Sequence, residues 1–73
     1  MSELPQISGP DLVRALEKLG FTVRRQQGSH IIMRRAEPFA QTVVPNHRQI
    51  DRGTLRAILR QVSLTPDDLR NAV

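Results

Sequence analysis

The spacing of the apolar residues changes twice along this chain, and these changes limit the folds that it can adopt. Between residues 8 and 20 apolar side chains recur at every third or fourth position, as on one buried face of a helix. From residue 21 to residue 44 the period is close to two, which is typical of strands buried on one face. The helical spacing then returns from residue 51. The sequence therefore predicts an α+β fold with strands between helices.

Three helices are predicted from capping residues followed by apolar stripes. The first is expected over residues 8–19, with Asp11 placed to complete a capping box and Gly20 as a C-terminal stop. The second is expected from residue 51 to about residue 62, and a short third helix from residue 65 to the terminus. The three expected capping residues are Ser8, Asp51 and Thr65.

Three strands are predicted between the first two helices. The first is expected from Phe21 to a turn at Gln27-Gly28, the second over His30–Arg35, and the third over Gln41–Val44 after a turn at Glu37-Pro38. Short connections favour an antiparallel meander with helices on one face, in the order α-β-β-β-α-α. Strict alternation along the first strand sets one group of side chains, Phe21, Val23 and Arg25, opposite the other group, Thr22 and Arg24.

Charge narrows the choice of partners. The chain has eleven basic and seven acidic residues, a net charge of +4, and ten of the eleven basic residues are arginine. An anionic partner is the first expectation. The planar guanidinium group of arginine binds phosphate as well as carboxylate, so the partner is either nucleic acid or an acidic protein surface, or each in turn. Only two aromatic residues are present, so a base-stacking platform is not expected.

Length and composition set the expected organisation. We expect one domain over residues 1–73, and a domain this short buries only about 60% of its unfolded surface, so a stabilising partner or self-association is expected. The chain has no cysteine, which suits a reducing cytoplasm. No stretch approaches the ~20 apolar residues of a membrane span, and residues 1–7 lack a signal-peptide pattern. We therefore expect a soluble cytoplasmic protein that does not contact membranes.

Four segments resemble the HicA, or YcfA-like, family of toxins. They are Gly28-Ser29-His30, the string Gly53–Gln61, Leu19-Gly20-Phe21 and Val44–His47, and the similarity covers roughly residues 8 to 70 in matching order. The resemblance implies a double-stranded-RNA-binding-like fold and ribonuclease (mRNA interferase) activity on mRNA. It also implies neutralisation by a HicB-type antitoxin, and it makes His30 the catalytic residue. We expect the neighbouring Ser29 to bind RNA.

RNA cleavage fits the chemistry of a single histidine. RNA supplies its own nucleophile, the 2′-hydroxyl, so the reaction needs a proton acceptor, a proton donor and stabilisation of the phosphate charge. Imidazole, with an unperturbed pKa of about 6.5, suits either proton role. The seven carboxylates are scattered along the chain and several mark helix starts, so a two-metal site is not predicted and no cofactor is expected. We therefore expect metal-independent transesterification.

The pattern alone leaves His30 open to a simpler interpretation, as a strand-end residue after a turn. Alternation sets His30, Ile32 and Arg34 on one face of the second strand. If the buried Ile31 and Met33 face the helices, His30 and Arg34 share the open face. This arrangement, together with the family resemblance, favours a catalytic His30 and an RNA contact at Arg34.

A second acid or base is a possible role of His47. If the turn at Glu37-Pro38 is tight, paired residue numbers of the second and third strands sum to about 75. This register sets His30 opposite Pro45 and within roughly 10 Å of His47. The alternative is a loop histidine that contacts phosphate or has no function.

A row of arginines recurs at every fourth position of the second helix. Arg52, Arg56 and Arg60 border its buried stripe, and no acidic residue inside the helix pairs with them. The row is a solvated face, a contact for RNA phosphates, or a contact for antitoxin carboxylates. Four further arginines, Arg24, Arg25, Arg34 and Arg35, could contribute similarly from the strands.

These observations favour an RNA endonuclease that a partner inactivates by covering the His30 face. Two alternatives remain. A non-catalytic RNA-binding module of the same fold would bind RNA without any dependence on His30. A protein-interaction domain for an acidic partner would have no affinity for RNA.

Overall fold

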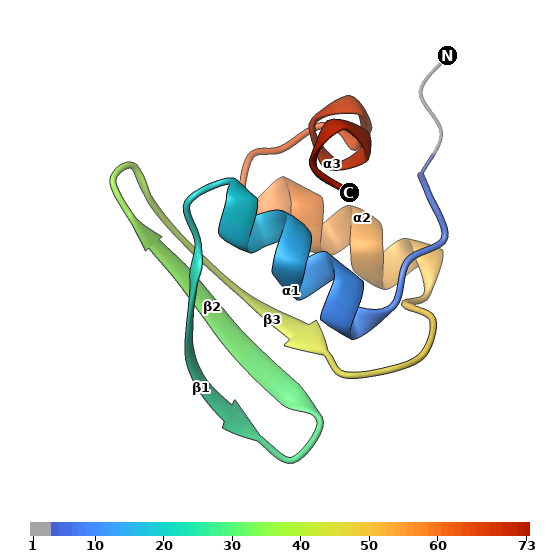
Figure 1. Cartoon of the computed structure of the whole chain (residues 1–73), viewed down its shortest axis with the longest axis horizontal. Coiled ribbons are helices and arrows are strands. Elements are labelled where there is room, and N and C mark those ends of the chain that lie inside the picture. Colours follow the sequence, from blue (N-terminus) through green and yellow to red (C-terminus); the bar gives the residue numbers. More distant parts are fainter. Residues whose placement is uncertain (1–3) are drawn as a thin grey trace.

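The structure is a computed structural model that describes residues 4–73 (Figure 1). The elements follow one another in the predicted order α-β-β-β-α-α. The expected single domain over 1–73 includes residues 1–3, which lie outside the described residues. The helices are α1 (Gly9–Lys18), α2 (Arg52–Gln61) and α3 (Pro66–Ala72), and the strands are β1 (Thr22–Gln27), β2 (His30–Ala36) and β3 (Phe39–Pro45).

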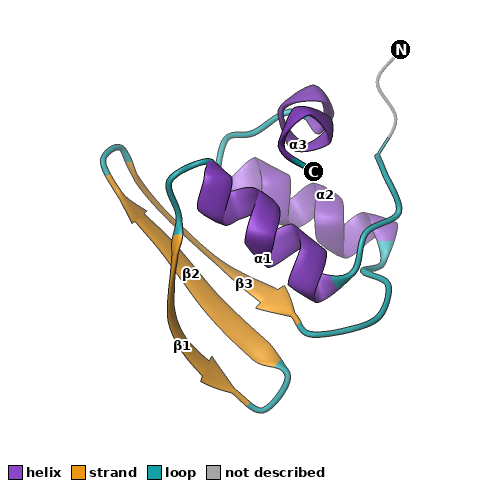
Figure 2. Ribbon diagram, viewed as in Figure 1, coloured by secondary structure: helices purple, strands orange, loops and turns teal. Residues whose placement is uncertain are grey.

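The strands form one antiparallel sheet in the order β1-β2-β3, and the helices lie on one side of it (Figure 2). Strands β2 and β3 pair from Ala36↔Phe39 to His30↔Pro45, so that only Glu37 and Pro38 separate them. The paired numbers sum to 75, as predicted from a tight turn. The α+β prediction, with a three-stranded meander and helices on one face, is confirmed.

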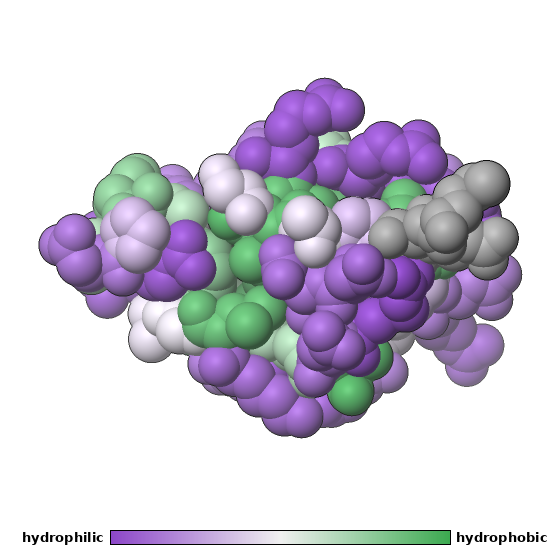
Figure 3. All heavy atoms as spheres, turned by 90° about the horizontal axis from the view of Figure 1, so that it is seen from above, coloured by the Kyte–Doolittle hydropathy of each residue, from purple (hydrophilic) through white to green (hydrophobic). Residues whose placement is uncertain are grey.

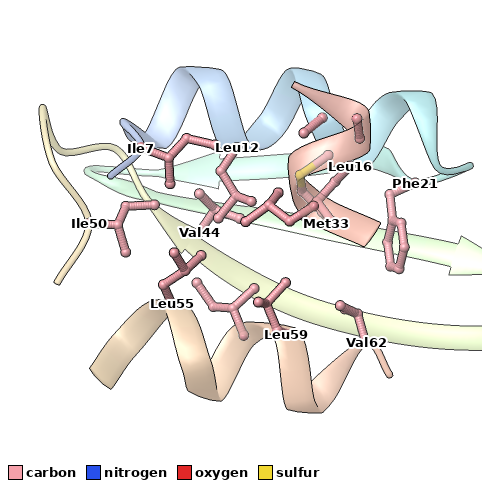
Figure 4. Close-up of a cluster of buried hydrophobic side chains, with 14 of the residues drawn as sticks. Ile7, Leu12, Leu16, Phe21, Met33, Val44, Ile50, Leu55, Leu59 and Val62 are labelled. Carbon is pink, nitrogen blue, oxygen red and sulfur yellow. The ribbon is translucent and has the colours of Figure 1, made fainter. Parts of the chain in front are cut away.

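The hydrophobic core lies between the sheet and the first two helices. Side chains from α1, α2 and the strands point toward one another there (Figure 4). Met33 of β2 and Val44 of β3 form the sheet side of the core, and neither is exposed to solvent. The apolar stripe predicted for the second helix is buried, and it consists of Leu55, Ile58 and Leu59 of α2 and the capping residue Val62. At about 25 cal/mol per Å² of apolar surface, this single layer supplies most of the favourable folding free energy of so short a chain.

The helix starts form where the sequence predicts them, with one difference. The Ser8 hydroxyl accepts a hydrogen bond from the Asp11 amide at 3.1 Å, but the Asp11 carboxylate pairs with Arg14, so the predicted box at α1 is incomplete. At α3 both bonds of the box are present, between Thr65 and Asp68. The Thr65 backbone N–H, and then its hydroxyl, lower the pKa of the Asp68 carboxyl. The contribution of this cap to stability is therefore lost as the pH falls through that lowered pKa.

The first predicted strand forms as β1, but the strict alternation predicted for it fails at Arg25. Pairing with β2 is regular at Val23↔Met33, but it resumes at Arg25↔Ile32, so Arg24 is an extra residue in a β-bulge. Arg25 therefore lies on the same face as Ile32, opposite to the alternation expected from Phe21. All six residues of β1 are exposed, because the β1–β2 hairpin extends beyond the helices (Figure 1). Solvent exposure removes the apolar constraint that would keep this strand regular.

Seen from above, the surface of the protein is mainly polar, with hydrophilic side chains around a smaller hydrophobic area (Figure 3). Among residues 4–73, no helix is long and apolar enough to cross a membrane.

Candidate functional site

The open face of the sheet carries the residues that the alternation of β2 turns away from the core. Ile31 and Met33 are buried against the helices, so the residues between and beside them point to the opposite side. Among these residues His30 is exposed, and Ile32 and Arg34 are half-buried. The structure therefore brings His30 and Arg34 to the same face, as the sequence predicted.

His30 stands at the end of β2 that lies beside the β1–β2 turn and the end of β3. It is the first residue of β2 and pairs with Gln27 on one side and Pro45 on the other. The turn before it contains Gly28, whose φ of +55° is accessible to glycine at little cost. Extended pairing on both sides fixes the backbone of His30, while its side chain remains free to contact a ligand.

His47 lies in the loop after β3 and is exposed. The residues before the two histidines are joined directly, because the Asn46 N–H donates to the Ser29 carbonyl at 2.7 Å. The predicted pairing of His30 with Pro45 is confirmed, and the role of His47 stays a prediction. Ser29 contributes its backbone to this junction.

The start of α1 holds the His47 loop in place. Gly9 donates its N–H to the His47 carbonyl at 2.8 Å, and Ile50 donates to the Ile7 carbonyl at 2.9 Å. A side chain at Gly9 would overlap the Pro45 carbonyl oxygen and reach within 2.9 Å of the Asn46 Cα. The close crossing of these two segments therefore requires glycine at position 9.

The arginine row of α2 lies elsewhere. Arg52, Arg56 and Arg60 are exposed on a helix that covers the face of the sheet opposite to His30. The side of α2 nearest to β3 is formed by other residues, including Thr54, Ala57 and Gln61. The structure does not bring the arginine row and His30 together on one face.

A second group of arginines surrounds a hollow on the open face of the sheet. The hollow has a volume of about 320 Å³ and is lined by Arg24, Arg25, Ile32, Arg34 and Gln41. Arg24 and Arg25 are consecutive, and the bulge allows both to line it. The sequence analysis named these arginines as possible contacts, but the bulge that gathers them leaves no signal in the sequence.

Arg35, the fourth strand arginine, has a structural role. Its guanidinium lies 4.7 Å from the centre of the Phe21 ring, and its Nε donates to the Pro38 carbonyl at 3.1 Å. Alternation places it on the helix side of β2. It does not belong to the open face with Arg34.

Several carboxylates are engaged in helix caps or ion pairs. Asp51 and Asp68 cap α2 and α3, and Asp11 and Asp67 pair with Arg14 and Arg70. Within residues 4–73, no three His, Cys, Asp or Glu side chains gather as metal ligands would.

These features define a class of protein: a small cationic α+β domain with an exposed histidine on the open face of a three-stranded antiparallel sheet. The model of the family described as "HicA toxin of bacterial toxin-antitoxin" matches residues 9–64. The chain therefore belongs to the HicA toxin family. A comparison with curated proteins gives no match.

The crossing at Gly9 yields a prediction about stability. Gly9→Ala should lower the free energy of unfolding by about 1–3 kcal/mol, because the new methyl group overpacks against the Pro45 and Asn46 backbone. Urea unfolding of both proteins measures the difference. Gly53→Ala is the matched control, since it lies in the first turn of α2 and its methyl would meet only the Asp51 carboxylate, at 3.2 Å. Equal losses in the two variants would contradict the crossing argument.

Proposed function

We propose that this protein is the toxin of a type II toxin–antitoxin system and that it is an RNA endonuclease, an mRNA interferase. The observation that carries the proposal is the position of His30 in a chain of the HicA toxin family. Its side chain is exposed, its backbone is paired on both sides, and it shares the open face with Arg34. A general acid or base must be fixed and must reach the substrate, and His30 meets both needs.

The reaction is a transesterification within the RNA. The 2′-oxygen attacks the adjacent phosphorus and loses its proton, the P–O5′ bond breaks, and the 5′-oxygen takes up a proton. His30 acts in one of the two proton transfers, and His47 is the candidate for the other. The net positive charge of the chain favours the negative charge that develops on the phosphate. The products are a 2′,3′-cyclic phosphate and a 5′-hydroxyl.

An antitoxin of the HicB type would inactivate the enzyme by covering this face. Protein that packs over the start of β2 excludes RNA from His30 without changing the fold. The surface that it must cover is cationic, so acidic side chains in the antitoxin suit it.

The catalytic assignment is tested by removing the imidazole. His30→Ala should lower the rate of RNA cleavage by at least about 10²-fold, the usual contribution of a general acid or base, and should abolish growth arrest on expression. The melting curve should stay close to that of the wild type, because His30 is exposed.

Arg14→Ala on α1 is the control and should remain toxic at equal expression. A toxic His30→Ala protein would contradict the assignment. Retained RNA binding without cleavage by the wild-type protein would favour the non-catalytic RNA-binding module instead.

Metal independence is tested by chelation. Cleavage should continue in EDTA at an unchanged rate, and the fragments should end in a 2′,3′-cyclic phosphate, or its hydrolysed form, and a 5′-hydroxyl. Support comes from four of the carboxylates, which are engaged in caps and ion pairs: Asp11, Asp51, Asp67 and Asp68. Mass spectrometry of the fragments identifies the ends. Activity that is lost in EDTA and restored by Mg²⁺ would overturn this part of the proposal.

The arginine row of α2 is proposed to bind RNA phosphates rather than to take part in the chemistry. Changing Arg52, Arg56 and Arg60 to Gln should make the plot of log affinity against log salt shallower by about two units, at roughly 0.7 per contact with a single strand. Cleavage at saturating RNA should change far less than in His30→Ala.

A control that removes the same charge is Arg14→Gln with Lys18→Gln and Arg70→Gln, on α1 and α3, which should leave the salt slope unchanged. An unchanged slope in the α2 variant would assign the row to the antitoxin or to solvent.

A further inference from the structure

We infer that the hollow on the open face is a binding site for one backbone phosphate of the RNA, next to the phosphate that reacts at His30. The inference rests on the proposed function, and it assigns Arg24, Arg25 and Arg34 as the residues that hold this phosphate. It gives a role to the bulge in β1 and to an unpartnered nitrogen of Arg34.

The first observation is that one nitrogen of the Arg34 side chain has no hydrogen-bond partner. Its Nε is buried and has no hydrogen-bond partner, although Arg34 pairs through its backbone with Thr22 and Gln41. A buried donor without an acceptor costs about 1–3 kcal/mol, and more when the group is charged. Because this Nε has almost no solvent-accessible surface, a phosphate oxygen in the hollow would satisfy it, and recover that cost, once the Arg34 side chain turns toward the hollow.

The second observation is the concentration of positive charge. The bulge turns two consecutive arginines toward the hollow that Arg34 also lines. The lining contains no carboxylate, and the two ion pairs within residues 4–73 lie on α1 and α3. Three guanidinium groups around one small hollow favour a compact anion, because more than one of them can contact it at once.

The third observation is the position of the hollow relative to His30. Residues of one strand rise by about 3.3 Å each, so the Arg34 backbone lies about 13 Å along β2 from His30, with Ile32 between them. Arg25 pairs with Ile32 and lies nearer. An RNA chain carries a phosphate at every nucleotide, so a strand that places one phosphate at His30 and follows β2 brings another to the hollow. An acidic partner protein has no such fixed spacing, which favours RNA.

The test uses the His30→Ala protein labelled with ¹⁵N, because it leaves the RNA uncut. A 12-nucleotide single-stranded RNA is titrated while the arginine Nε–H signals are recorded. The Arg34 signal should shift, and its exchange with water should slow. The Arg14 signal on α1 should stay unchanged. DNA of the same sequence should shift the Arg34 signal as well, because the site contacts phosphate and not the 2′-hydroxyl.

The second measurement is the affinity for RNA and its dependence on salt concentration. Arg25→Gln with Arg34→Gln should weaken RNA binding and make the salt slope shallower by about 0.7, the value for one single-strand contact. Arg24→Gln with Arg25→Gln changes only exposed side chains and should act in the same direction, so the test does not depend on the packing of Arg34. The control of equal charge is Arg14→Gln with Lys18→Gln, which should leave the slope unchanged.

Each outcome has one meaning. An unshifted Arg34 signal, or an unchanged slope in both hollow variants, overturns the phosphate site even if the wild-type protein cleaves RNA. A shift of the Arg34 signal together with the shallower slope supports the site even if cleavage fails, and then only the ribonuclease proposal is lost. A shift with polyglutamate but not with RNA or DNA overturns the site in favour of a surface for an acidic protein.

Discussion

Burial of one face of the sheet under α1 and α2 determines where the strand side chains of β2 and β3 lie. Met33 and Val44 are buried on the helix side of the sheet. Because successive residues of a strand point to opposite faces, their neighbours point to the solvent side. A one-residue shift of β2 would exchange the two sets and would expose the core. The exposed position of His30 therefore follows from the packing of the residues beside it.

Much of this arrangement could be predicted from the sequence, because it depends on local signals. The helix caps, the two-residue turn and the alternation of β2 and β3 together define the register that pairs His30 with Pro45. The bulge at Arg24 could not be predicted, since an exposed strand of polar residues has no apolar pattern to mark a break. The need for glycine at position 9 arises from a backbone that is distant in sequence. The same holds for the contact of Arg35 with Phe21.

The cationic residues form two surfaces with different surroundings. The arginine row of α2 lies on the helix layer, and the arginines around the hollow lie on the open face of the sheet. A protein that covers the sheet face would cover both the hollow and His30. It would leave the α2 row exposed, because the two surfaces lie on different layers of the fold.

The bulge also affects how the sequence can diverge. Arg24 and Arg25 are exposed and belong to a hairpin that extends beyond the helices, so neither contributes to the hydrophobic core. Surface substitutions at such positions usually change stability by less than about 0.5 kcal/mol. Mutations there are therefore tolerated by folding, and the positive charge around the hollow can change in evolution without passing through unstable intermediates.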